Sequence, residues 1–213
     1  MGIQNRKERE KNQRREQILN AAITLIENKG FENTTMEEIA EEAELSKGTL
    51  YLYFNDKQTL HQAIKKRALE FLHDKFLIII QKDLKGAELV KKMMIASIEL
   101  IYENVAFTKA MIRYEIKTDD DIREDSMVSD CTNIENELMI LTMRGIQIGF
   151  QDGSIKSTLD PKTLALQIGF QMRGMIQFSL TKCKQKDLPI MSENNLDLKK
   201  LTEQFLKVQF NSN

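Results

Sequence analysis

Apolar residues recur along most of the chain at intervals of three and four positions, which is the spacing of an amphipathic helix. With only nine Gly and two Pro among 213 residues, few positions interrupt this pattern. We therefore predict an all-α protein of about nine helices. They are expected over residues 16–29, 35–43, 46–53, 56–80, 86–104, 105–117, 126–151, 160–182 and 196–210.

Signals for the start of a helix cluster early in the chain. Thr35, followed three residues later by Glu38, forms a capping box. Ser46 is placed to cap a second helix, and Asn55 with Gln58 is placed to cap a third. Two short helices separated by a tight turn and followed by a longer helix form the outline of a helix-turn-helix.

Charge is unevenly distributed over this region, although the net charge of the whole chain is only −1. Residues 1–15 carry six basic and two acidic side chains, a net charge of +4, whereas residues 16–60 carry three basic and nine acidic side chains, a net charge of −6. We interpret the first segment as a basic arm, including Arg14, that contacts phosphates; a solvated terminus is the alternative. The acidic second helix would repel DNA, so the base-reading surface must lie elsewhere.

The helix expected over residues 46–53 has a different surface. Its outward positions are small or carry hydrogen-bonding groups, and Lys47 is its only charge. Small side chains allow a close approach to DNA, hydroxyl groups reach phosphates or base edges, and a lysine can address guanine. Leu45, Leu50 and Phe54 are expected to face inward. The candidate base-reading residues are Ser46, Lys47, Gly48, Thr49, Tyr51 and Tyr53.

These residues form part of a longer motif, which consists of Phe31, Thr35, Ile39, Ala40, Ala43, Leu45-Ser46-Lys47-Gly48-Thr49-Leu50-Tyr51, Tyr53-Phe54, Lys57 and Leu60. The motif resembles the N-terminal domain of the tetracycline-repressor (TetR) family. The resemblance implies a two-domain, all-helical, homodimeric transcription factor, most often a repressor of a palindromic operator. It implies a helix-turn-helix domain over residues 1–55 and a ligand-binding and dimerisation domain over residues 56–213. It also makes Thr35 and Lys57 phosphate contacts.

One position departs from the family pattern, because Glu44 stands in the turn where the family usually has Gly. A residue other than Gly in a left-handed turn conformation costs roughly 1–2 kcal/mol. We therefore expect either a turn of slightly different shape or a strain that packing absorbs.

In this resemblance the second domain binds a small molecule that releases the protein from DNA. Eleven methionines indicate adaptable apolar walls, so we expect a hydrophobic or amphipathic organic ligand. Ordinary core packing is the alternative for each residue. No cofactor is expected, since no Gly-rich loop indicates a nucleotide and no Cys/His cluster indicates a metal. The candidate ligand-binding residues are Met93, Met94, Tyr102, Phe107, Met111, Tyr114, Met139, Met143, Phe150 and Met172.

The helix expected over residues 160–182 has more apolar surface than the core of one subunit needs. We therefore expect a homodimer. The resemblance places its interface in the last two long helices, over about residues 160–182 and 196–210.

The alternative functions are an enzyme, a helical protein-interaction module and a transcriptional activator. An enzyme needs a convergent set of titratable groups, and two histidines with the single pair Glu70-x-x-His73 do not supply one. A helical protein-interaction module and a transcriptional activator remain open.

Cys131 and Cys183 are interpreted as reduced, buried residues, with redox sensing as the alternative. No apolar run approaches the ~20 residues of a membrane span. We expect a cytoplasmic, nucleoid-associated protein.

Overall fold

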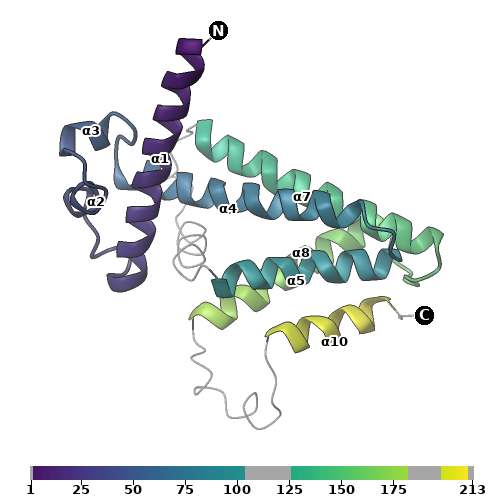
Figure 1. Cartoon of the computed structure of the whole chain (residues 1–213). Coiled ribbons are helices and arrows are strands. Elements are labelled where there is room, and N and C mark those ends of the chain that lie inside the picture. The colour runs from purple at the N-terminus through teal and green to yellow at the C-terminus, as the bar shows by residue number, and fades with distance from the viewer. Residues whose placement is uncertain (1, 104–125, 182–197, 211–213) are drawn as a thin grey trace. The chain divides into compact units, whose positions relative to one another are not determined.

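The computed structural model describes residues 2–103, 126–181 and 198–210, and all regular structure within these ranges is helical (Figure 1). This confirms the predicted fold class. The helix expected over residues 105–117 lies outside the described residues. The helices are α1 (Gly2–Lys29), α2 (Met36–Glu42), α3 (Lys47–Tyr51), α4 (Lys57–Ile80), α5 (Gly86–Glu103), α7 (Ser126–Gln151), α8 (Pro161–Thr181) and α10 (Leu198–Phe210).

The chain divides into two compact units. Unit 1 contains the residues up to Arg67 together with the start of α7 up to Cys131, and unit 2 contains the rest of the described chain. The sequence predicted a boundary between residues 55 and 56, where α4 begins. The observed division falls inside α4, because the first turns of this helix bury Leu60 and Ile64 in unit 1.

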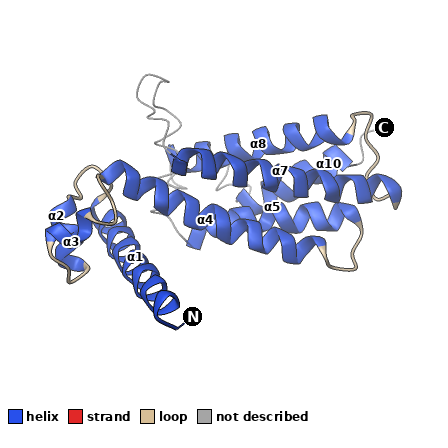
Figure 2. Ribbon diagram, turned by 90° about the horizontal axis from the view of Figure 1, so that it is seen from above, coloured by secondary structure: helices blue, strands red, loops and turns tan. Residues whose placement is uncertain are grey.

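Unit 1 is built around a short apolar core. α1 packs against α2, and α2 packs against α3, which lies beside it in both views (Figures 1 and 2). An ion pair between Lys66 Nζ and Asp130 Oδ2, 2.6 Å apart, joins α4 to the start of α7 within this unit. The largest fully buried side chains of unit 1 are Ile18, Leu19, Ile26, Ile39, Leu50, Phe54, Leu60 and Ile64.

The basic segment at the start of the chain is helical. The sequence predicted a basic arm over residues 1–15 and a helix from residue 16, but α1 begins at Gly2. Lys, Arg, Glu and Gln are good helix formers, and Arg6 pairs with Glu10 one turn later at 2.8 Å. Arg14 is exposed on this helix, so the phosphate contacts predicted for the arm would be made by a helix face.

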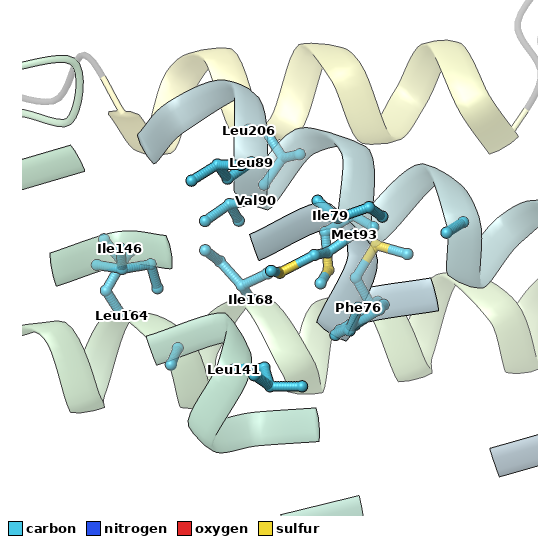
Figure 3. Packing of buried hydrophobic residues seen from close by; sticks show 14 of the residues in the cluster. Phe76, Ile79, Leu89, Val90, Met93, Leu141, Ile146, Leu164, Ile168 and Leu206 are labelled. Atoms are coloured by element: carbon cyan, nitrogen blue, oxygen red, sulfur yellow. The ribbon is translucent and has the colours of Figure 1, made fainter. Parts of the chain in front are cut away.

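Unit 2 holds the larger core, to which α4, α5, α7, α8 and α10 all contribute (Figure 3). The helix expected over residues 160–182 is observed as α8, which begins with Pro161 after the capping residue Asp160. The side chains labelled in Figure 3 are Phe76, Ile79, Leu89, Val90, Met93, Leu141, Ile146, Leu164, Ile168 and Leu206.

The start of α5 lies unusually close to α7. A Cβ atom added at Gly86 would lie 2.0 Å from the backbone nitrogen of Gly149 and 2.6 Å from the carbonyl oxygen of Gly145. The loop after α7 caps the same end of α5, because Gly86 N–H donates to Asp152 Oδ2 at 2.8 Å and Ala87 N–H donates to the Ser154 hydroxyl at 3.0 Å. Hydrogen bonds from Ser154 and from Gly86 hold the pKa of Asp152 below its usual value.

Candidate nucleic-acid interface

The two helices of the helix-turn-helix begin at the caps that the sequence predicted. The N–H of Thr35 donates to Glu38 Oε2 at 2.8 Å and the N–H of Glu38 donates to Thr35 Oγ1 at 3.3 Å, which completes the capping box. Ser46 caps α3 by accepting the N–H of Thr49 at 3.1 Å. The reciprocal bonds at α2 and the single bond at α3 satisfy backbone donors that a helix leaves open, and so fix where the two helices start.

The predicted third cap is wrong by one residue. Asn55 was expected to cap α4, but Asp56 Oδ1 accepts the N–H of Thr59 at 2.7 Å. Asn and Asp are about equally good caps, so their order in the sequence cannot decide which of two neighbours serves.

The turn between α2 and α3 places Glu44 in the left-handed region with φ of +53°. Leu45 N–H donates to the carbonyl of Ala40 at 2.8 Å, and Glu44 N–H donates to that of Glu41 at 2.9 Å. These two bonds form a Schellman motif, in which Glu44 occupies the position that favours Gly. The turn therefore keeps the usual shape, and the chain carries a left-handed glutamate to achieve it.

Replacing Glu44 by Gly is expected to stabilise unit 1 by about 0.5–1 kcal/mol. The change relieves the cost of a left-handed residue with a Cβ atom, and the greater freedom of Gly in the unfolded chain offsets part of the gain. Urea denaturation followed by circular dichroism measures the effect. As a control, Glu41→Gly changes an exposed glutamate inside α2 and should destabilise by about 0.5–1 kcal/mol. Equal effects of the two substitutions would show that the turn is not strained.

α3 presents a small exposed surface supported by a buried side. Lys47, Gly48 and Tyr51 are exposed, whereas Leu50 and Phe54 are buried as predicted. The other candidates surround this surface, since Ser46 is exposed and Thr49 and Tyr53 are half-buried. Sequence reasoning missed Leu52, which follows α3 and is 85% exposed.

The charged group of α3 already has a partner on α2. The Lys47 ammonium forms an ion pair with the Glu37 carboxylate and lies 5.9 Å from the centre of the Tyr51 ring. The hydrogen bond from Lys47 lowers the pKa of Glu37, and the same bond raises the pKa of Lys47. Both side chains are more than half exposed, so solvent screens this pair and Lys47 can exchange it for another acceptor.

Lys57 serves the protein itself. Its ammonium donates to the backbone carbonyls of Phe31 at 2.9 Å, Glu32 at 3.3 Å and Thr34 at 2.9 Å, and it lies 4.5 Å from the centre of the Phe31 ring. Partial burial lowers the pKa of this ammonium. The three N–H groups of a lysine are therefore used within unit 1. Lys57 thus fixes the loop that leads into α2, and its predicted phosphate contact stays a prediction that requires one of these bonds to be exchanged.

Replacing Lys57 by Met is expected to destabilise unit 1 by about 1–3 kcal/mol, because three carbonyl groups lose a charged donor and two of these hydrogen bonds, to Phe31 and Thr34, are partly buried. Thermal unfolding measures the loss. Lys57→Arg keeps a charged donor and should recover part of the stability. Unchanged stability of the methionine variant would contradict the structural role.

The predicted ligand-binding residues of unit 2 occupy the core or its edge. Met93, Met94 and Met172 are buried in the core, and Met139, Met143 and Phe150 are half-buried and packed against the same core. The side chain of Tyr102 and the residues Phe107, Met111 and Tyr114 lie outside the described residues. The structure therefore brings six of the candidates to one core.

An open groove of about 410 Å³ lies elsewhere in unit 2, between α5 and α10, and none of the described candidates lines it. Its walls carry charged side chains at the rim, including Lys91, whose ammonium lies 3.4 Å from Glu203. The lining residues are Ala87, Glu88, Lys91, Lys200, Glu203, Gln204, Leu206, Lys207 and Phe210.

The remaining candidate chemistry resolves into structural contacts. Cys131 is buried as predicted, with Sγ 3.9 Å from the carbonyl oxygen of Gln62, and Cys183 lies outside the described residues. His73 Nε2 lies 3.3 Å from the carboxylate of Glu137. Within the described ranges no group of three or more His, Cys, Asp or Glu is placed to hold a metal ion, and none of the described helices is long and apolar enough to cross a membrane.

Two capped short helices, a Schellman turn and a small exposed surface on the second helix define a helix-turn-helix DNA-binding protein. Residues 18–64 match the family described as "Bacterial regulatory proteins, tetR family". The matched segment contains α2 and α3, so the helix-turn-helix of this chain is of the tetR type, and the chain is a DNA-binding transcriptional regulator.

Known proteins resemble this chain in sequence or in fold. The HTH-type transcriptional repressor KstR2 of Rhodococcus jostii (strain RHA1) is 26% identical over 150 residues, which cover 70% of this chain and 72% of that protein. The transcriptional regulator FadR from Bacillus subtilis, solved in complex with stearoyl-CoA, superposes with a TM-score of 0.68 at 17% identity, covering 92% of this chain and 97% of that one. AibR, solved with isovaleryl coenzyme A and operator DNA, superposes with a TM-score of 0.64 at 21% identity, covering 92% and 98%. The two structures share its fold.

Proposed function

We propose that the protein is a homodimeric repressor that inserts α3 into the major groove of a palindromic operator and is released by an amphipathic small molecule. The observation that carries the proposal is the exposed surface of α3, which is small, nearly uncharged and held by caps at a fixed position. A surface of this kind can approach base edges closely, whereas the glutamates of α2 would be repelled by phosphates.

The proposed contacts follow from exposure and chemistry. The Lys47 ammonium leaves its partner Glu37 and donates hydrogen bonds to a guanine. The hydroxyl of Tyr51 reaches a base or phosphate beside it. Thr35 and Arg14 are exposed and are proposed to contact the phosphate backbone of the DNA. Smaller contributions are assigned to Ser46, Gly48, Thr49 and Tyr53, and Lys57 is left out because its ammonium serves the loop before α2.

We place the dimer interface on α8 and α10. Phe170 on α8 is 68% exposed and Leu166, one turn earlier, is 37% exposed, while Val208 on α10 is 67% exposed. An added Cβ at Gly174 would meet no atom within 4 Å, so a second helix has room to approach α8 at this point. Large apolar side chains on a helix surface favour burial against an identical subunit.

An acyl-CoA thioester is the effector class that we propose. It combines an apolar chain with a strongly polar group, which matches the amphipathic ligand expected from the sequence. The comparison structures FadR and AibR each carry a ligand of this class. Met93, Met94 and Met172 fill the core of unit 2, and the flexible methionine side chain can rearrange around an entering acyl chain.

Release from DNA is proposed to occur by a population shift. Half-sites one helical turn apart require recognition helices about 34–36 Å apart, and an effector that prefers another spacing lowers operator affinity. Moving the population from 1:99 to 99:1 requires a difference of about 5.5 kcal/mol in effector affinity between the two states. Because its target is chromosomal DNA, we place the protein in the cytoplasm at the nucleoid.

Fluorescence anisotropy tests this function on a duplex selected by the purified protein from randomised DNA. The complex is titrated with CoA thioesters of increasing chain length, and free CoA serves as the control. We expect thioesters to dissociate the complex and free CoA to leave it intact. A complex that no thioester dissociates would contradict the proposed effector class, but it would not contradict the proposed binding to DNA.

A further inference from the structure

Leu52 is an apolar side chain exposed to water at the edge of the DNA-reading surface. It is 85% exposed, whereas Leu50, two residues earlier, is fully buried. Leu52 directly follows α3 and keeps a helical conformation, with φ of −70° and ψ of −22°. It therefore continues the surface of α3 by one residue.

Helical spacing aligns Leu52 with Gly48. Residues four apart lie on the same side of a helix, so Gly48 precedes Leu52 by one turn, and Lys47 precedes Tyr51 along a neighbouring line. The distance of 5.9 Å between the Lys47 ammonium and the centre of the Tyr51 ring supports this alignment. A Cβ added at Gly48 would meet only the Ser46 hydroxyl, at 3.9 Å, so the surface beside Leu52 is low and open. On the exposed surface, Lys47 and Tyr51 thus form a polar line. Beside this line, Gly48 leaves a notch, and the apolar side chain of Leu52 follows it.

We propose that Leu52 selects a thymine in each operator half-site by contacting its 5-methyl group. This inference rests on the proposed insertion of α3 into the major groove. Thymine is the only base that presents a methyl group there, and an apolar side chain is the complement of that group. The notch at Gly48 lets the base edge come close, and Leu52 then covers the methyl group.

The size of the effect follows from the area buried. Removing one methyl group from an apolar contact weakens binding by about fourfold for each half-site, and thus about 16-fold for a dimer on two half-sites. Replacing Leu52 by Ala removes the partner of this contact and should weaken binding by at least as much.

The experiment uses the full chain and the highest-affinity duplex that it selects from randomised DNA. Each thymine is replaced, symmetrically in both half-sites, by deoxyuridine, which lacks only the methyl group. Anisotropy titrations are then made with the wild-type protein, Leu52→Ala, Leu52→Met and the control Ile78→Ala, which shortens a 62%-exposed side chain in unit 2.

We expect one thymine position at which deoxyuridine weakens the wild type, Leu52→Met and Ile78→Ala by about 16-fold but leaves Leu52→Ala unchanged. Equal sensitivity of Leu52→Ala and the wild type at every position would overturn the inference while the operator complex stands. So would a wild type that deoxyuridine does not affect. Failure to select any duplex would overturn the proposed function, and this inference with it. Because Leu52 is exposed, thermal unfolding should show all variants folded.

Discussion

Gly86→Ala is expected to destabilise unit 2 by more than about 4 kcal/mol. The new Cβ would lie 2.0 Å from a backbone nitrogen of Gly149, and the obstacle is backbone, which cannot rotate away as a side chain can. α5 would have to move away from α7. That movement would also break the hydrogen bonds that the N–H groups of α5 donate to Asp152 and Ser154, and it would open the core around Leu89 and Val90.

Gly48→Ala is the matched control, because it makes the same chemical change in a helix where the added carbon meets nothing closer than 3.9 Å. It should leave stability unchanged or raise it by up to about 1 kcal/mol. Urea denaturation of both variants measures the difference. If Gly86→Ala unfolded at the wild-type urea concentration, the close contact between α5 and α7 would be wrong.

Lys47→Ala and Tyr51→Ala are each expected to weaken operator binding by about 10- to 100-fold while leaving stability unchanged. Both side chains are exposed on α3, so their loss removes contacts to DNA and little internal packing. Anisotropy titration on the selected duplex measures affinity, and thermal unfolding confirms the fold.

Glu37→Gln distinguishes a DNA contact of Lys47 from its internal ion pair. This substitution breaks the same pair but removes an anion from the DNA side, so it should tighten binding by about two- to fivefold. If the variants at Lys47 and at Glu37 both weakened binding, the pair itself would be the feature that matters, and Lys47 would not be a DNA contact.

The features predicted correctly from the sequence are those that neighbouring residues decide. A cap needs only a side chain and a backbone N–H three residues on, so Thr35 and Ser46 could be identified without the fold. The buried side of α3 follows from periodicity in the same way, and so does the start of α8 at Pro161. Glu44 was singled out by the family resemblance, which has Gly in this turn, and the structure gives it the left-handed conformation that favours Gly.

The features that were missed depend on residues far apart in the chain. The partners of Lys57 lie 23 to 26 residues earlier, and only the path of the loop before α2 shows that they face its ammonium. Gly86 is one glycine at a helix start until the structure places Gly149 against it. Leu50 is buried and Leu52 is exposed, although both are leucines two residues apart. The exposure of Leu52 depends on the end of α3 at Tyr51, which the sequence did not predict.

Sequencing of the DNA fragments that the purified full-length protein selects from a randomised library tests the central claim most directly. A dimer that places two copies of α3 in the major groove predicts an inverted repeat, with half-site centres separated by one helical turn or a multiple of it. It also predicts that Lys47→Ala, taken through the same selection, enriches this repeat weakly or not at all. Enrichment of no sequence, or of one without twofold symmetry, would contradict the account.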